Sequence, residues 1–217
     1  HPRSSAASDV YKRQEYGCNV KGISLSEEQI SYCLKKQKSS KNSKDLEYSL
    51  QDYRNENNHY DKIVSVGMFE HVGKPFYNTY FKKVNDLLSD NGIAVIHTIG
   101  NVRTPKLTPA FIRKYIFPGG YIPSLSEIMP AVEKSGLIIS DIEVLRLHYA
   151  DTLRNWYKNF QKSEKQVLDL YDERFIRMWE SYLNLSEISF RKGDNVVYQL
   201  VLTKKRDTFP IVRKRIN

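Results

Sequence analysis

The chain has 217 residues, of which 40% are hydrophobic and 27% charged, a balance typical of a globular protein rather than a disordered one. It contains no apolar run near the roughly 20 residues that a membrane-spanning helix needs, and no secretory signal is recognisable. Two cysteines are too few for a disulfide framework and lack metal-ligand spacing, so we expect a reducing cytoplasm and no metal.

The formal net charge of +9 favours a polyanionic partner, either nucleic acid or an anionic membrane surface. Much of the excess lies in two segments, residues 35–44 and 204–215. The named nucleic-acid-binding modules, with their paired Cys/His spacing or aromatic strand motif, are not recognisable here. Charge alone does not decide between lipid and nucleic acid.

The first residues differ in character from the rest. Residues 1–14, HPRSSAASDVYKRQ, are small, polar and aperiodic, and they resemble a translated cloning scar. We therefore expect a non-native leader over 1–14, one domain over 15–203 and a basic tail over 204–217. On this interpretation the natural protein continues upstream of Glu15.

From there strands and helices alternate along the chain. Ser26 and Gln29 have capping-box spacing, which predicts a helix start. A helix over 75–88 should end at the turn signal Asn91-Gly92, and Ser124 or Ser126 should cap another that Gly136 stops. A helical region follows over 151–190. Strands are predicted over 19–25, 46–50, 60–69, 92–99, 137–147 and 196–203.

This alternation predicts an α/β protein with a mostly parallel sheet and helices on both faces. The strand over 60–69 is nearly continuous in apolar residues, as expected when both of its faces are covered. In such sheets, ligands bind beyond the carboxyl ends of the strands. The candidate site residues are therefore the polar ones that follow or end a strand.

Three residues meet that description: Glu70, His97 and Tyr149. Each also has an ordinary structural explanation. An acid after a strand can cap the next helix, a histidine inside a strand can be a hydrogen-bonded core residue, and a tyrosine there can simply pack. A base, an imidazole and a phenol at neighbouring strand ends are more informative together than any one of them alone.

Several segments resemble one known family. YDKIVSVGMFEHVG (60–73), GIAVIHTIG (92–100), KYIFPGGYIPS (114–124), HYADTLRNWYKNF (148–160), GISLSEEQ (22–29) and YDERFIRMWESYLN (171–184) are similar, in order, to segments of the cyclopropane-fatty-acyl-phospholipid synthases and mycolic acid cyclopropane synthases. The resemblance covers about residues 15–203 and implies a class I methyltransferase fold that uses S-adenosyl-L-methionine. A methyl group would be delivered to a cis double bond of a phospholipid acyl chain.

The resemblance also implies a bound bicarbonate that removes a proton from the new methyl group in a water-excluded cavity. Glu70, His97 and Tyr149 match the side chains that hold this anion, and Ile99 matches a position that contributes a backbone group. For the cofactor, the implied contacts to ribose and methionine are Ser24, Leu25 and Gln29, while Asp52, Tyr53 and Arg54 would surround the adenine, with Tyr53 stacking on it.

The family's glycine-rich turn and first strand are not found in this sequence. Because that turn lets the backbone approach the cofactor closely, we expect this chain to bind S-adenosyl-L-methionine weakly or not at all. The candidates for the walls of an acyl-chain tunnel or, equally, for ordinary core packing are the segment from Phe111 to Pro123 and the aromatic residues Trp156, Tyr157, Phe160, Phe175 and Trp179.

The expected partner is an unsaturated phospholipid in an anionic membrane, on whose inner face the basic protein would dock peripherally; a homodimer is possible. Two other interpretations stay open. One is a related methyltransferase that makes methyl-branched or otherwise modified lipids or methylates a small metabolite. The other is a non-enzymatic, basic lipid-binding remnant.

Overall fold

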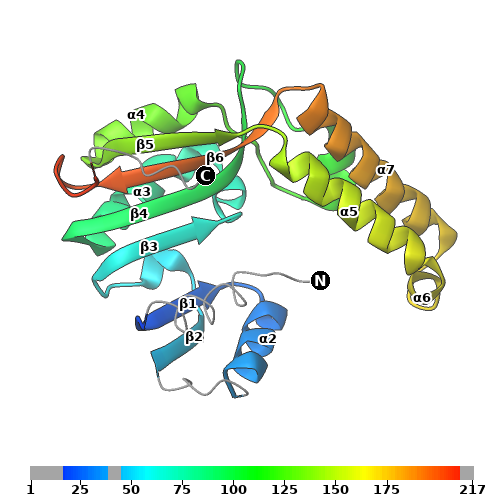
Figure 1. Ribbon diagram of the computed structural model, residues 1–217, viewed down its shortest axis with the longest axis horizontal. Coiled ribbons are helices and arrows are strands. Elements are labelled where there is room, and N and C mark those ends of the chain that lie inside the picture. Colours follow the sequence, from blue (N-terminus) through cyan, green and yellow to red (C-terminus); the bar gives the residue numbers. More distant parts are fainter. Residues whose placement is uncertain (1–16, 39–44, 211–217) are drawn as a thin grey trace. The chain divides into compact units, whose positions relative to one another are not determined.

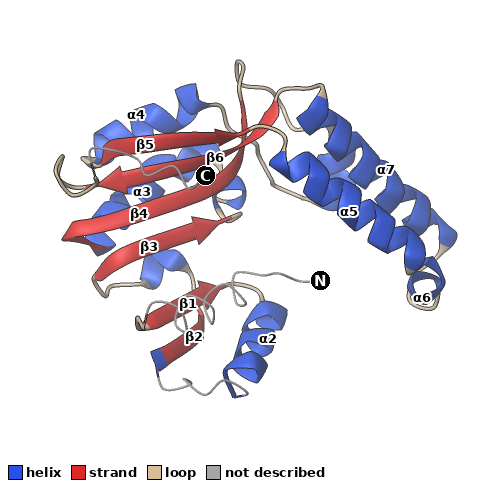
Figure 2. Ribbon diagram, viewed as in Figure 1, coloured by secondary structure: helices blue, strands red, loops and turns tan. Residues whose placement is uncertain are grey.

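The computed structural model describes residues 17–38 and 45–210, which fall into two compact units, one within 1–58 and the other within 59–217. In both units strands and helices alternate along the chain (Figures 1 and 2). The predicted leader, residues 1–14, lies outside the described residues. Within the described residues, the helices and strands follow one another in the predicted order.

The first unit is a strand–helix–strand motif. Strands β1 (Val20–Ser24) and β2 (Leu46–Leu50) pair in parallel, and helix α2 (Glu27–Lys38) lies between them in sequence. The helix begins where the sequence predicts, because the Ser26 hydroxyl accepts a hydrogen bond from the amide of Gln29 at 3.2 Å. A small core fixes the helix on the strands: Ile30, Cys33, Leu46 and Tyr48.

The second unit is built on a four-stranded sheet with the order β3-β4-β6-β5. Strands β3, β4 and β5 run in the same direction, whereas β6 is antiparallel to both of its neighbours. The prediction of a mostly parallel sheet is thus confirmed, with β6 as the exception. The strands are β3 (Tyr60–Val66), β4 (Leu88–Asn101), β5 (Ile138–Leu145) and β6 (Asn195–Thr203).

One face of this sheet is fully buried where its two central strands meet. The register of β4 and β6 pairs Ala94 with Leu202, Ile96 with Leu200 and Thr98 with Tyr198, and all six side chains are buried. Because side chains alternate along a strand, His97 and Ile99 lie on the opposite face. The sheet therefore presents a polar residue, His97, on the face that is not its main core.

Helices α3 (Tyr77–Leu87) and α4 (Leu125–Ser135) lie side by side on one face of the sheet (Figure 1). Of the two candidate caps, Ser124 begins α4: it forms a reciprocal capping box with Glu127. Gly136 ends the helix with a φ of 81°, in the left-handed region that glycine favours, as the sequence predicts.

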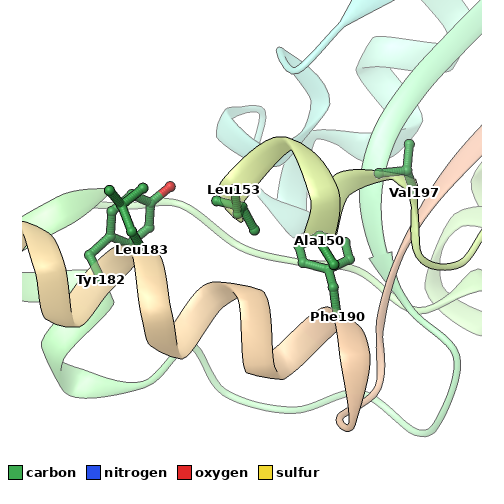
Figure 3. Packing of buried hydrophobic residues seen from close by; sticks show 6 residues of the cluster. All are labelled: Ala150, Leu153, Tyr182, Leu183, Phe190 and Val197. Atoms are coloured by element: carbon green, nitrogen blue, oxygen red, sulfur yellow. The ribbon is translucent and has the colours of Figure 1, made fainter. Parts of the chain in front are cut away.

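The predicted helical region is confirmed as three helices: α5 (His148–Lys162), α6 (Glu164–Leu168) and α7 (Glu173–Arg191). Helices α5 and α7 lie side by side beyond the carboxyl end of β5 (Figure 1). The residues that join them to the sheet form one buried cluster (Figure 3): Ala150, Leu153, Tyr182, Leu183, Phe190 and Val197.

Two predictions about the strands are wrong. Strand β4 begins at Leu88 and runs through the expected turn at Asn91-Gly92, because Leu88 pairs with Tyr60 and the register then shifts before Ile93. Strand β3 ends at Val66 rather than at residue 69, and it is not buried along its length, since Val64 and Val66 are about half exposed.

Candidate active site

Glu70 is held just beyond the carboxyl end of β3 by a short turn. The chain leaves the strand at Gly67, whose φ is 68° and whose amide donates to the carbonyl of His97 at 3.0 Å. A 3-10 turn over Phe69–His71 follows. Phe69 is completely buried and stacks on Tyr77 with ring centroids 4.5 Å apart, so its burial fixes the position of the next residue, Glu70.

The two carboxylate oxygens of Glu70 have different surroundings. Oε1 accepts a hydrogen bond from the amide of Ile99 at 2.8 Å, which ties Glu70 to the end of β4. Oε2 is buried and has no hydrogen-bond partner among the described residues. Since a buried carboxylate oxygen without a donor is costly, this atom marks a position where a ligand with an O–H or N–H group would fit.

His97 lies one strand away from Glu70, half-buried in β4. Burial lowers the pKa of its imidazole, and the nearby charge of Glu70 opposes that shift. The net lowering favours the neutral ring at neutral pH. The Nδ1 atom of the His97 ring lies 3.1 Å from Nε2 of Gln199 in β6.

Tyr149 joins this pair from the first turn of α5 rather than from a strand end. Its ring packs against Phe190 and Trp156, with centroid distances of 5.1 and 5.9 Å. Burial, followed by the charge of Glu70, raises the pKa of the phenol, which therefore stays protonated and able to donate. The charge of Glu70 thus acts on both His97 and Tyr149, so both side chains lie within electrostatic range of this carboxylate.

The backbone amide of Ile99 already has a partner within the protein. Its amide is already engaged by Glu70, and its side chain packs against the cluster around Ala150 and Leu153. In this structure Ile99 orients the carboxylate. The backbone contribution to an anion that the resemblance implies stays a prediction.

A second carboxylate, that of half-buried Glu127 on α4, lies near this site, and sequence reasoning did not single it out. Burial alone would raise its pKa, but hydrogen bonds from Lys74, the amide of Ser124 and the hydroxyl of Tyr121 lower it instead. The amide of Tyr121 also donates to the carbonyl of Glu70 at 2.9 Å. Because its oxygens are taken up by these donors, Glu127 acts as a support for the loop around Glu70. The capping-box spacing of Ser124 and Glu127 was the available signal.

The predicted cofactor residues lie together at one edge of the first unit. Ser24 ends β1 and Leu50 ends β2 directly beside it, so Ser24, Leu25 and Gln29 share the carboxyl edge of this small sheet with the segment Asp52, Tyr53 and Arg54. The hydroxyl of Ser24 donates to the Gln29 amide oxygen at 2.8 Å, while Leu25 is exposed.

The loop after β2 is held in shape by ion pairs. Asp52 caps the turn by accepting from the amide of Arg54 at 2.8 Å, and Arg54 also pairs with its carboxylate at 2.6 Å. Buried Glu56 pairs with Lys21 at 2.9 Å. Tyr53 is half-buried, and burial raises its pKa. Hydroxyl, amide, carboxylate and aromatic groups at one strand edge suit a nucleoside with a charged amino-acid tail.

The predicted acyl-chain wall divides into two parts. Tyr157, Phe160 and Trp179 pack against the cluster between α5 and α7, as core residues do. Phe111, which also packs against that cluster, and Phe175 line an open, mainly apolar groove of about 420 Å³, together with Tyr115, Asp172, Arg174 and Met178. Trp156 belongs to neither part: it is partly exposed and packs against Tyr149.

Comparison with known proteins assigns the family. The family model described as mycolic acid cyclopropane synthetase matches residues 8–200. The chain belongs to this family. It is 38% identical over 194 residues, 89% of its length, to the cyclopropane-fatty-acyl-phospholipid synthase of Escherichia coli K12, and it covers 50% of that protein.

Two further relatives agree. The tuberculostearic acid methyltransferase UfaA1 of Mycobacterium tuberculosis is 36% identical over 195 residues, which are 87% of this chain and 46% of that protein. The crystal structure of mycolic acid cyclopropane synthase CmaA1 with SAH and CTAB matches with a TM-score of 0.84 at 28% identity, over 90% of this chain and 73% of that one. The fold is that of the class I methyltransferases, as predicted. The chain spans about half the length of the curated relatives it matches.

Among the described residues, no helix is both long enough and apolar enough to cross a membrane.

Proposed function

We propose that the protein takes part in S-adenosyl-L-methionine-dependent methyl transfer to the cis double bond of an unsaturated phospholipid acyl chain, giving a cyclopropane ring. Bicarbonate is the proposed base. The observation that supports this proposal is that the charge of Glu70, whose buried Oε2 lacks a partner among the described residues, acts on both His97 and Tyr149.

The chemistry of the three side chains suits a small anion that must itself accept a proton. Methyl transfer to an alkene leaves a positive carbon, and ring closure needs the loss of one proton from the new methyl group; bicarbonate supplies a weak base for that proton. Glu70 Oε2 accepts the O–H of the anion, which makes its other oxygens more basic. Neutral His97 and protonated Tyr149 donate to it without adding the positive charge that would weaken it as a base.

The surroundings of the three groups favour exclusion of water. Tyr149 is packed between aromatic rings, and the turn that carries Glu70 is anchored by fully buried Phe69. Because water would trap the positive carbon as an alcohol, a dry setting protects the reaction. Correct placement of a general base is typically worth about 10²- to 10⁴-fold in rate.

For the cofactor, the proposed holders are the residues at the edge of the first unit. Asp52, Tyr53 and Arg54 would surround the adenine, and Ser24, Leu25 and Gln29 would face the ribose and methionine parts. S-Adenosyl-L-methionine supplies the electrophilic methyl group. The polar groups that the first unit gathers at one strand edge support this assignment.

The proposed lipid partner and place of action follow from surface chemistry. The net charge of +9 favours an anionic headgroup layer, at about 1 kcal/mol per Lys or Arg near the membrane surface. The groove lined by Phe111 and Phe175 offers an apolar surface next to Arg174. We therefore propose peripheral docking on the inner face of a membrane, with an unsaturated phospholipid as the partner.

The test is to express the open reading frame that contains this chain in a host without cyclopropane lipids and to profile its fatty acids by mass spectrometry. Addition of one CH₂ to a monounsaturated chain with no change in its hydrogen deficiency supports ring formation. A saturated, methyl-branched product would instead support the related-methyltransferase interpretation. Unchanged lipids, with the protein present and folded, would contradict the proposal.

A matched pair of variants tests the site itself. Glu70→Gln removes the acceptor while keeping the shape, and we expect at least about a 100-fold loss of turnover with little change in cofactor affinity. Glu133→Gln, an exposed carboxylate on α4, is the control and should retain wild-type turnover. Equal losses of turnover and cofactor affinity in Glu70→Gln would count against the assigned role.

A further inference from the structure

Gln199 lies in β6, beside His97, and no local sequence pattern marks it out. In the antiparallel pairing of β4 and β6, Gln199 stands directly opposite His97. Directly opposed residues share a face of the sheet, so both side chains lie on the face opposite buried Ala94 and Ile96. Their contact is direct: Gln199 Nε2 lies 3.1 Å from His97 Nδ1.

The chemistry of an amide nitrogen fixes the direction of this hydrogen bond. An amide NH₂ group only donates, so Nδ1 of His97 must accept, and a neutral ring then carries its proton on Nε2. We propose that Gln199 is a positioning residue that holds His97 in the Nε2–H tautomer, so that its free N–H is available to an anion beside Glu70. Without this partner, the neutral ring would divide between two tautomers, and only one of them presents a donor from Nε2.

The groups around His97 are consistent with a neutral ring. Glu70 approaches from the turn after β3, and its charge favours the imidazolium form. Burial favours the neutral form and outweighs the charge of Glu70, so the pKa of the imidazole is lowered. Glu143 of β5 stands opposite Gln199 on the other side of β6, so Gln199 holds the register position between Glu143 and His97.

This inference deepens the proposed function, because it names the residue that prepares His97 as a donor. Its test does not require turnover. The chain is labelled with ¹⁵N-histidine, and long-range ¹H–¹⁵N correlation spectra report which ring nitrogen carries the proton. The His97 signals are assigned by their loss in His97→Asn among the five histidines of the chain.

Three variants are compared with wild type. Gln199→Glu replaces the donor by an acceptor, so we expect the Nδ1–H arrangement and a His97 pKa raised by about one unit or more. Gln199→Met keeps the length but removes the hydrogen bond, so we expect a mixture of tautomers. Gln161→Met, on exposed α5 surface away from any histidine partner, is the control and should match wild type.

Two results would overturn the inference. The first is a wild-type His97 with its proton on Nδ1, which would mean that the amide oxygen faces the ring. The second is a Gln199→Glu variant whose His97 tautomer and pKa both match wild type. If Gln199→Glu does not fold, Gln199→Met decides by the same spectra. A wild-type Nε2–H tautomer in a protein that leaves host lipids unchanged would refute the proposed function and leave the positioning role intact.

Discussion

Replacement of Gly100 by alanine tests the strand register that builds the site. Gly100 lies in β4, next to Ile99 and three residues beyond His97. A Cβ added there would stand 2.1 Å from Cε2 and 2.2 Å from Cδ2 of Tyr198, on the neighbouring strand β6. Carbon atoms in contact are normally about 3.5–4.0 Å apart, so the ring would have to move by more than about 1 Å.

The ring of Tyr198 has little freedom to move. Its side chain is 1% exposed, and its hydroxyl donates to the carbonyl of Asn101 at 2.8 Å. Overpacking of a core typically costs about 1–3 kcal/mol. Because the obstacle is a buried, hydrogen-bonded ring rather than a flexible chain end, we expect Gly100→Ala to cost about 3 kcal/mol of the free energy of unfolding.

The assay is urea unfolding followed by circular dichroism, performed as a double-mutant cycle. In a Tyr198→Ala background the ring is gone, so Gly100→Ala should cost less than about 1 kcal/mol. In a Tyr198→Phe background the ring remains and most of the cost should persist. A cost below about 0.5 kcal/mol in wild type, or equal costs in all three backgrounds, would refute the register and with it the pairing of His97 with Gln199.

Two further predictions concern charge. Glu187 is buried and pairs with Arg154 and Arg191 at 2.9 and 2.7 Å. Burial would raise its pKa, but these two partners lower it, so its stabilising contribution should be present above its unfolded pKa of about 4.5 and be lost as pH falls through the lower folded value. Glu187→Gln should therefore destabilise by about 1–3 kcal/mol at pH 7 and by much less at pH 3, measured by urea unfolding; a pH-independent difference would contradict this account. For His97, burial lowers the folded pKa below its ordinary value of 6.5, so its contribution to stability is present above that value and is lost as pH falls through the folded pKa. An NMR titration should give a His97 pKa below 6.5 in wild type and a still lower one in Glu70→Gln, since the charge of Glu70 raises it; an unchanged pKa in that variant would show that the two groups do not interact.

Local signals in the sequence predicted most element boundaries. Strand β2 begins and ends where it was predicted, and Gly136 ends α4 with the expected left-handed conformation. These features depend on residues a few positions apart, where hydrophobic periodicity and turn chemistry act. Asn91-Gly92 shows the limit of such signals. Leu88 pairs with Tyr60 of β3, so β4 begins at Leu88 and includes the two residues that local chemistry predicts as a turn.

The candidate site was predictable only in part. Residue types at strand ends, with the family resemblance, selected Glu70, His97 and Tyr149. The contact of Gln199 with His97 spans 102 residues of sequence, and it depends on how β6 registers against β4, which no local pattern specifies. The hydrogen bond from Ile99 to Glu70 likewise depends on the length of β3 and on the turn at Gly67.

The central claim is that Glu70, His97 and Tyr149 hold bicarbonate as the base for ring formation. The most direct test is the dependence of turnover on added bicarbonate in buffer freed of carbon dioxide. It is measured for the protein from the complete open reading frame and for its Tyr149→Phe variant, with Tyr157→Phe as a control from the same helix. The account predicts that wild type and Tyr157→Phe lose turnover without bicarbonate and regain it in a saturable manner, whereas Tyr149→Phe needs a much higher concentration. Full turnover without bicarbonate would contradict it.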